Sequence, residues 1–300
     1  KEIVGQKEII EHIFIALLCK GHILLEGVPG LGKTLIVKSI TKALDLKFNR
    51  IQFTPDLMPS DIIGTEIIGQ DSETGNREFK FIKGPVFSNI ILADEINRTP
   101  PKTQAALLEA MQESKVTTGG VTYDLDNPFF VLATQNPIEQ EGTYPLPEAQ
   151  LDRFMFNILI DYPSFEEEQD IVKANTTSGK QDLQNIITKE DLIDFQKLVM
   201  DIPIADNVIE YAVNLSHSTR PINKCPKITK KYIEWGAGPR SSSFLILAAK
   251  AGAILKGEPT PNIDDIKKIA KPVLRHRIIL NFNAEAEGIK TDDILDQLIN

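Results

Sequence analysis

The sequence predicts an α/β fold, in which a three-layer αβα domain with a mostly parallel sheet precedes an all-α domain. One observation is a series of short apolar runs, which are typical of strands buried on both faces of a parallel sheet. Another is that helical patterns separate these runs, as they do in α/β domains. The strand pattern then stops, so we expect a boundary near residue 163, with domains at 1–163 and 164–300.

The expected elements of the first domain follow from hydrophobic periodicity. Helices are expected over 7–20, 35–44 and 103–112, where apolar side chains recur at helical spacing. The predicted strands are the apolar runs 23–25, 51–53, 90–93, 129–133 and 156–160. Ligands of such domains bind at the carboxyl ends of the strands, so we expect the functional site at that edge of the sheet.

Two inserts interrupt this alternation, and each has the pattern of a β-hairpin. Residues 65–82 contain two strand patterns around a turn rich in Asp, Ser, Gly and Asn. Residues 115–125 contain two short strand patterns around Gly119-Gly120, a strong signal for a two-residue turn. Beyond residue 165, amphipathic helical patterns alternate with joints that contain proline or glycine, which predicts helices to the end of the chain.

Composition excludes several classes of protein. Hydrophobic residues make up 42% and charged residues 25% of the 300 residues, as in ordinary globular proteins. No apolar run approaches the roughly 18 residues of a membrane span, and no signal peptide opens the sequence. The two cysteines stand alone, which fits a reducing compartment, and neither they nor the four histidines have metal-ligand spacing. We therefore expect a cytoplasmic protein. Because the helical pattern begins soon after Lys1, we also expect a preceding segment in the natural chain.

The net charge of −9 makes a nucleic-acid partner unexpected, because binding to phosphate needs a positive surface. Two local clusters of lysine and arginine, within 224–231 and 267–277, are the exceptions. A solvated helix face is the simpler interpretation of both clusters.

The strongest motif is Gly-Val-Pro-Gly-Leu-Gly-Lys-Thr at 27–34, which fits the phosphate-loop pattern G-x-x-x-x-G-K-[ST] between a strand and a helix. Its glycines let successive N–H groups point at a phosphate, and the helix N-terminus adds partial positive charge. Lys33 would reach the β- and γ-phosphates, and the Thr34 hydroxyl would ligate Mg²⁺. The residues expected to hold the nucleotide are Val28, Pro29, Gly30, Leu31, Gly32, Lys33, Thr34, Leu35 and Asp94.

Two later strand ends carry polar residues that suit catalysis. Asp94 would hold Mg²⁺ directly or through a water, and Glu95 would polarise the attacking water, which separates a hydrolase from a nucleotide binder. Asn136 could hold that water or a γ-phosphate oxygen. The alternatives are two surface acids at 94–95 and a simple turn before Pro137.

The order of these motifs, followed by a helical domain, resembles an AAA+ ATPase. Four stretches resemble the MoxR family over nearly the whole chain, namely 3–6, 84–98, 106–113 and 133–137. The resemblance implies Mg²⁺-dependent ATP hydrolysis by a homo-oligomeric ring, expected to be a hexamer. It also implies chaperone-like remodelling or maturation of protein partners, with von Willebrand factor A domain proteins as the expected class.

The resemblance assigns roles to individual positions. They are Lys33 and Thr34 (Walker A), Asp94 and Glu95 (Walker B), Asn136 (sensor 1), Arg153 (arginine finger), Arg240 (sensor 2), and Val4 and Gly5 (adenine contact). Lys33, Glu95, Asn136, Arg153 and Arg240 form the expected catalytic set. The two hairpins resemble inserts that face a central pore. One departure is Gly238, where relatives often carry serine, and it leaves Arg240 untouched.

The two arginine assignments also make physical sense. Phosphoryl transfer spreads negative charge over the γ-phosphoryl oxygens, and a guanidinium stabilises that charge. An arginine donated by a neighbour makes hydrolysis depend on assembly, hence the expected ring. The alternatives are a surface ion pair of Arg153 with Asp152 or Glu148, and helix-end solubility for Arg240.

Three further functions stay open from the sequence. One is a nucleic-acid remodelling or translocating ATPase, which calls for basic, aromatic hairpin tips. The tip at 70–76 is acidic and the tip at 118–120 is neutral, which weighs against it. The others are a chelatase-type motor subunit and a nucleotide sensor without hydrolysis. The presence of both Asp94 and Glu95 disfavours a pure sensor.

Overall fold

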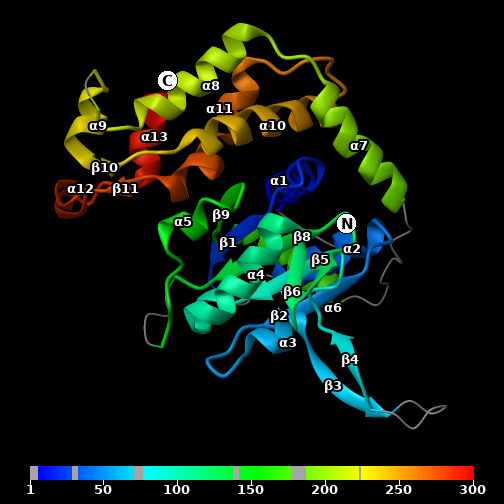
Figure 1. Cartoon of the computed structure of the whole chain (residues 1–300). Helices are drawn as coiled ribbons and strands as arrows, with labels where there is room; N and C mark the ends of the chain where they lie inside the picture. The colour runs from blue at the N-terminus through cyan, green and yellow to red at the C-terminus, as the bar shows by residue number, and fades with distance from the viewer. Residues whose placement is uncertain (1–5, 29–32, 71–76, 138–141, 177–186, 223) are drawn as a thin grey trace. The chain divides into compact units, whose positions relative to one another are not determined.

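Figure 1 shows the computed structural model of the chain, which describes residues 6–28, 33–70, 77–137, 142–176, 187–222 and 224–300. The chain divides into two compact units. The first unit includes Leu24–Leu146 and Leu159–Asp191, and the second consists of Glu8–Ile23, Pro147–Ile158 and Leu192–Asn300. Each unit is therefore made of several separate segments of the chain. The single domain boundary expected near residue 163 stays a prediction.

A five-stranded sheet has the strand order β2-β5-β8-β1-β9. Its strands are β1 (Ile23–Gly27), β2 (Phe48–Gln52), β5 (Ile90–Asp94), β8 (Phe130–Gln135) and β9 (Phe156–Ile160). The pairs β2–β5 and β5–β8 are parallel, and Ile91 lies opposite both Asn49 and Val131. Side chains of β5 and β8 are almost completely buried, as expected for central strands. The predicted parallel α/β sheet is confirmed.

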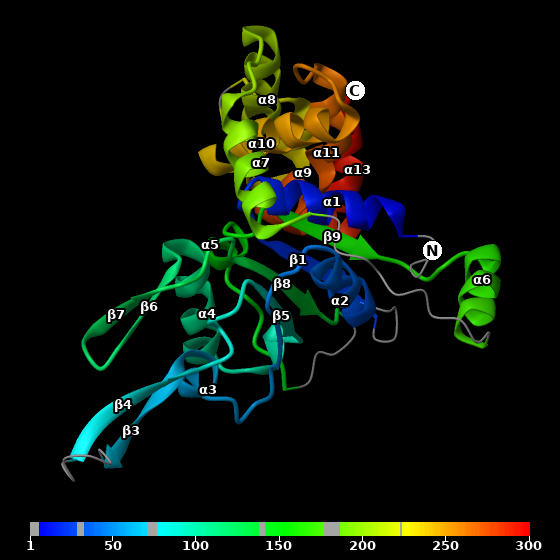
Figure 2. The same cartoon turned by 90° about the vertical axis from the view of Figure 1, so that its right-hand side faces the viewer.

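The helices of the first unit flank this sheet. Figure 2 shows α2 (Lys33–Ala43) and α4 (Pro101–Glu113) on opposite sides of the strands, which completes the three layers. This unit also contains the short helix α3 (Pro59–Ile63) and the helix α6 (Phe165–Thr176). The strand β2 begins earlier than the predicted run 51–53, at Phe48. Because β2 is an edge strand, it carries the exposed polar residues Asn49 and Arg50, which do not belong to an apolar run.

Both predicted hairpins are present, as antiparallel pairs β3 (Gly64–Gln70) with β4 (Arg77–Lys83) and β6 (Lys115–Thr118) with β7 (Val121–Asp124). Residues 71–76 of the first turn lie outside the described residues. In the second turn Gly119 and Gly120 both have positive φ, 56° and 78°, the conformation that favours glycine there.

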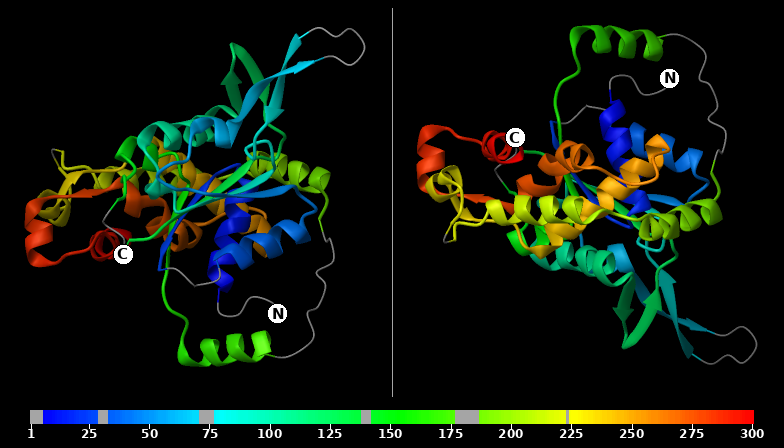
Figure 3. Two further views of the ribbon diagram at one scale, coloured as in Figure 1. Left: turned by 90° about the horizontal axis from the view of Figure 1, so that it is seen from below. Right: turned by 90° about the horizontal axis from the view of Figure 1, so that it is seen from above.

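The two hairpins contact each other through aromatic side chains. Phe81 of β4 stacks on Tyr123 of β7 with ring centroids 4.6 Å apart, and Phe87 makes T-shaped contacts with both rings. Figures 2 and 3 show the hairpins extending from the same side of the first unit. The hairpins are therefore packed together rather than independent.

The second unit is predominantly helical. It contains α1 (Lys7–Leu18, from residue 8 on), α5 (Glu148–Leu151), α8 (Asp206–Ser218), α9 (Lys227–Tyr232), α10 (Pro239–Lys256), α11 (Ile263–Leu274), α12 (Phe282–Glu287), α13 (Thr291–Ile299) and most of α7 (Lys189–Asp201). One short antiparallel pair, β10 (Ile233–Trp235) with β11 (Ile279–Leu280), was not expected from the sequence. Within the described residues, no helix is both long and apolar enough to cross a membrane.

Candidate functional site

The described part of the phosphate loop joins the end of β1 to the start of α2. Lys33 is the first residue of α2, and its Nζ donates a hydrogen bond to the carbonyl of Gly27 at 2.5 Å. Burial lowers the pKa of Lys33, and the negative charges of Asp94, Glu95 and Glu26 oppose that shift. Lys33 therefore lies in the field of the two acids that the sequence placed in the same site.

The structure describes some of the predicted nucleotide contacts and not others. Val28 and Thr34 are half-buried, and Leu35 is 50% exposed. The predicted contacts of Val4, Gly5, Pro29, Gly30, Leu31 and Gly32 lie outside the described residues. Those assignments stay predictions.

Asp94 is the last residue of β5, and its carboxylate is held from two sides. Arg50, on the neighbouring strand β2, donates to Oδ2 from Nε at 3.0 Å and from Nη2 at 2.6 Å. The Thr134 hydroxyl, on the other neighbour β8, donates to Oδ1 at 2.6 Å. Only 17% of the Asp94 side chain is exposed, so it is not the surface acid of the alternative interpretation.

Glu95 follows in a left-handed backbone conformation, with φ at 59°. This region is uncommon for residues other than glycine, and such strain is frequently found at functional sites. Its N–H donates to the Thr134 hydroxyl at 2.9 Å. Since that hydroxyl in turn donates to Asp94, Thr134 fixes both the strained backbone and the acid beside it.

The carboxylate of Glu95 is also anchored. Its Oε2 accepts a hydrogen bond from Gln52 Nε2 at 2.7 Å and forms an ion pair with Arg98 Nη1 at 3.2 Å. Arg50 Nη2 donates to Gln52 Oε1 at 2.6 Å, which fixes the orientation of the amide. Arg50 and Gln52 of β2 thus hold the two acids in a single hydrogen-bonded chain.

Asn136 comes directly after β8 and is 6% exposed. Because β8 lies beside β5, parallel to it, Asn136 is at the same carboxyl edge of the sheet as Asp94 and Glu95. The catalytic role of Asn136 stays a prediction.

We expect the substitution Thr134→Val to slow nucleotide turnover by at least about tenfold, because it removes a hydrogen bond to the Asp94 carboxylate and leaves the Glu95 N–H without this acceptor. Phosphate release at saturating ATP measures the effect. The matched control is Thr134→Ser, which keeps the hydroxyl and should stay near the unsubstituted rate. Equal rates for the valine and serine variants would show that the bridge has no catalytic importance.

Arg153 and Arg240 both belong to the second unit. Arg153 is half-buried and lies between α5 and β9. The helix α10 begins at Pro239, so Arg240 lies in its first turn. Arg240 Nη1 forms an ion pair with Asp152 Oδ2 at 2.6 Å, which links the two predicted arginine motifs within the same unit.

Comparison with known proteins agrees with this arrangement. The family model for the ATPase family associated with various cellular activities (AAA) matches residues 22–156, and the AAA lid domain model matches residues 226–298. Chaperone MoxR1 of Mycobacterium tuberculosis is 43% identical over 298 residues, covering 99% of this chain and 78% of that protein. The chain belongs to the MoxR family of AAA+ ATPases.

Two further matches extend over nearly the whole chain. The Bacillus subtilis protein YeaC is 45% identical over 99% of this chain and 89% of its own length. A protein from Cytophaga hutchinsonii with a known crystal structure is 48% identical in sequence to this chain, and the two structures superpose with a TM-score of 0.91. The match covers 99% of this chain and 89% of the Cytophaga hutchinsonii chain. The resemblance to MoxR proteins that the sequence motifs indicated is confirmed.

Two side chains at the site carry oxygen atoms that suit Mg²⁺, the metal implied by membership of the AAA family. Mg²⁺ is generally held by one or two protein oxygens together with substrate phosphates and waters. Thr34 in the first turn of α2 and Asp94 at the end of β5 are such donors. Within the residues that the structure describes, no group of three or more His, Cys, Asp and Glu side chains could hold a metal ion.

Reading the MoxR motifs in the sequence did not reveal Arg50, Gln52 or the role of Thr134. A signal for Gln52 was present, since it is a polar residue inside the apolar run predicted for β2. Its significance depends on the sheet order, which places β2 beside β5 with Gln52 opposite Asp94. Thr134 belongs to the MoxR-like stretch 133–137, and the sequence gives no sign of its role.

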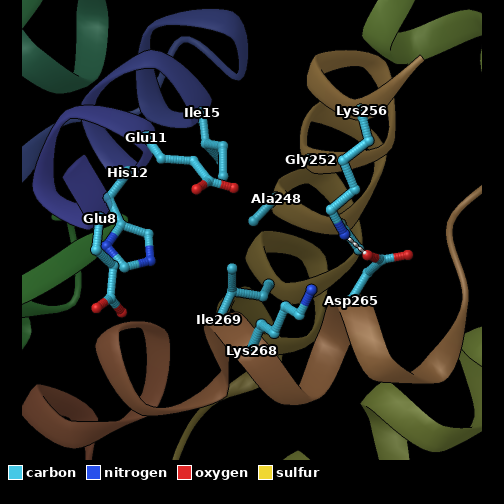
Figure 4. Close-up of a pocket in the computed structure, with 11 residues that line it drawn as sticks. Glu8, Glu11, His12, Ile15, Ala248, Gly252, Lys256, Asp265, Lys268 and Ile269 are labelled. Atoms are coloured by element: carbon cyan, nitrogen blue, oxygen red, sulfur yellow. Dashed lines mark hydrogen bonds and ion pairs between the residues drawn. The ribbon is translucent and has the colours of Figure 1, made fainter. Parts of the chain in front are cut away.

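A separate pocket of about 290 Å³ lies within the second unit of this MoxR chain, among α1, α10 and α11 (Figure 4). An ion pair between Lys256 and Asp265 forms one side of it. Its other polar lining residues are Glu8, Glu11, His12 and Lys268. His12 is 7% exposed, and burial lowers the pKa of its imidazole. Among the residues that the structure describes, no predicted nucleotide or catalytic residue lines this pocket.

Proposed function

We propose that this chain is a MoxR-type ATPase that hydrolyses ATP with Mg²⁺, assembles as a homo-oligomeric ring, expected to be a hexamer, and remodels or matures protein partners in the cytoplasm. The observation that carries the hydrolytic part is the edge of the sheet at β5 and β8. There Asp94 and Glu95 are fixed by Thr134, and Lys33 at the start of α2 lies in their electrostatic field.

Each residue has a distinct task in this proposal. Lys33 and the loop amides bind the phosphates, while Thr34 and Asp94 hold the metal, which neutralises phosphate charge when bound. Glu95 accepts the proton of the attacking water, and Asn136 orients that water or a γ-phosphate oxygen. Arg240 binds phosphate, and Arg153 acts on the nucleotide of the next subunit. Val4 and Gly5 are assigned to the adenine.

The carboxylate of Glu95, the proposed base, is already engaged by other side chains in this structure. Both Gln52 and Arg98 bind the same oxygen, Oε2. Two donors on one carboxylate oxygen occupy the lone pairs with which that oxygen would accept a proton. We infer that productive binding of the nucleotide loosens at least one of these contacts.

Ring assembly has its own expected result. Subunits with Arg153→Ala and subunits with Glu95→Gln should each hydrolyse ATP poorly alone, because each lacks one half of the catalytic interface. Mixing them should restore activity, since an interface with Glu95 from one subunit and Arg153 from its neighbour is complete. Phosphate release as a function of the mixing ratio measures this.

A matched control replaces the second partner by the double variant Arg153→Ala/Glu95→Gln. No interface in that mixture has both residues, so its activity should stay at the level of the single variants. If the first mixture also stays inactive at every ratio, Arg153 does not act between subunits.

The protein-remodelling part rests on the family and on the name of the relative Chaperone MoxR1. Because the Glu95→Gln variant should hold ATP without hydrolysis, it should retain partner proteins in ATP. We expect a von Willebrand factor A domain protein among them. Equal capture by Lys33→Ala, which should not bind ATP, would contradict partner binding driven by nucleotide.

A further inference from the structure

The carboxylate of Asp152 is shared by two arginines of the second unit. Oδ1 accepts from Arg277 Nε at 2.8 Å, and Oδ2 accepts from Arg240 Nη1 at 2.6 Å. The two arginines differ sharply in exposure: the side chain of Arg277 is 1% exposed, whereas that of Arg240 is 44% exposed. One carboxylate therefore joins a buried cation to an accessible one.

Arg277 is a permanent partner of Asp152. Besides the carboxylate, its guanidinium donates to the carbonyls of Asp152, Phe154, Met155 and Val273, so all five N–H groups have acceptors. Burial lowers the pKa of Arg277 to about 10, and the charge of Asp152 acts against that shift. Asp152 is thus the counter-ion that allows a buried guanidinium, and removing one member of such a pair is costly.

Arg240 is the exchangeable partner. Its ion pair with Asp152 is exposed to solvent, and exposed pairs contribute little to stability. If Arg240 leaves, Asp152 is still neutralised by Arg277. A more highly charged anion, such as a nucleotide phosphate, can therefore compete for Arg240 without leaving a buried charge unpaired.

Asp152 also precedes Arg153 in the chain. The residues on both sides of Arg153 are fixed by the segment 276–277. Arg277 Nη2 donates to the carbonyls of Asp152 at 2.9 Å and Phe154 at 2.6 Å, and His276 Nε2 lies 3.0 Å from the latter. The backbone on both sides of Arg153 is therefore held by the same buried arginine that pairs with the Asp152 carboxylate.

We propose that Asp152 is a positioning residue that holds Arg240 while no nucleotide is bound and yields it to phosphate on binding. The proposal rests on the role of Arg240 in binding phosphate that is stated under the proposed function. It adds that Asp152 competes with the nucleotide, and that Arg277 keeps Asp152 in place.

A double-mutant cycle tests this competition. Dissociation constants for MgATP are measured in the Glu95→Gln background for Asp152→Asn, Arg240→Ala and the double variant. When Arg240 is present, we expect Asp152→Asn to lower the dissociation constant about twofold to fivefold. This is the change that corresponds to the energy of an exposed ion pair that no longer has to be broken. In the Arg240→Ala background it should have no effect. The exposed Asp201→Asn on α7 controls for the change in net charge.

The outcomes separate the two proposals. If MgATP binds and Asp152→Asn has the same effect with and without Arg240, the competition is refuted while the ATPase proposal stands. If the parent protein does not bind MgATP, both are refuted. Should Asp152→Asn fail to fold, Asp152→Asn/Arg277→Met removes the buried cation together with its counter-ion, and the same dependence on Arg240 is expected.

Discussion

Replacing Glu95 by glutamine is expected to slow ATP hydrolysis at least about a hundredfold while leaving ATP binding intact. An amide cannot accept the proton of the attacking water. It can still accept the hydrogen bond that Gln52 donates, and the N–H of residue 95 keeps its bond to Thr134, so the local fold should persist. Steady-state phosphate release and calorimetric titration with ATP measure the two quantities separately.

The matched control for this change is Glu168→Gln on α6, an exposed glutamate of the same unit. It makes the same change in charge away from the strand ends and should turn over ATP like the unsubstituted protein. Normal turnover by Glu95→Gln would remove Glu95 from its role as base. A loss of ATP binding by Glu95→Gln would instead indicate that the residue is needed to build the site.

The parts of this site that could be predicted are those carried by local sequence. A strand, a glycine-rich turn and a helix in succession define the phosphate loop, and an apolar run that ends in Asp94-Glu95 marks a strand end. Central strands were located well because burial on both faces produces continuous apolar runs. The two glycines at 119–120 likewise encode their turn through positive φ.

The contacts that hold the acids could not be predicted, because they depend on which strands are neighbours. Gln52 and Glu95 are brought together by the pairing of β2 with β5. Nothing in the local sequence of β2 shows that pairing. The sequence suggests only Arg153, the next residue, as an ion-pair partner for Asp152. Its ion pairs with Arg240 and Arg277 join residues from three distant segments.

Replacing Lys33 by alanine is expected to abolish ATP binding. Lys33 is the first residue of α2 and the one cationic side chain of the phosphate-loop motif. The substitution removes the hydrogen bond from Nζ to the Gly27 carbonyl, but burial lowers the pKa of Lys33, so losing the charge also relieves a desolvation cost and little net change in stability is expected. Unchanged or higher thermal stability together with lost binding would therefore assign the effect to the ligand.

The matched control is Lys38→Ala, an exposed lysine on the same helix. Both variants remove one positive charge from α2 and add alanine, a good helix former, so they differ only in whether the side chain reaches the loop. Calorimetric titration with MgATP should show normal affinity for Lys38→Ala and none for Lys33→Ala. Similar affinities for the two variants would mean that the phosphates are bound elsewhere, and the roles given to Thr34, Asp94 and Glu95 would then fail together.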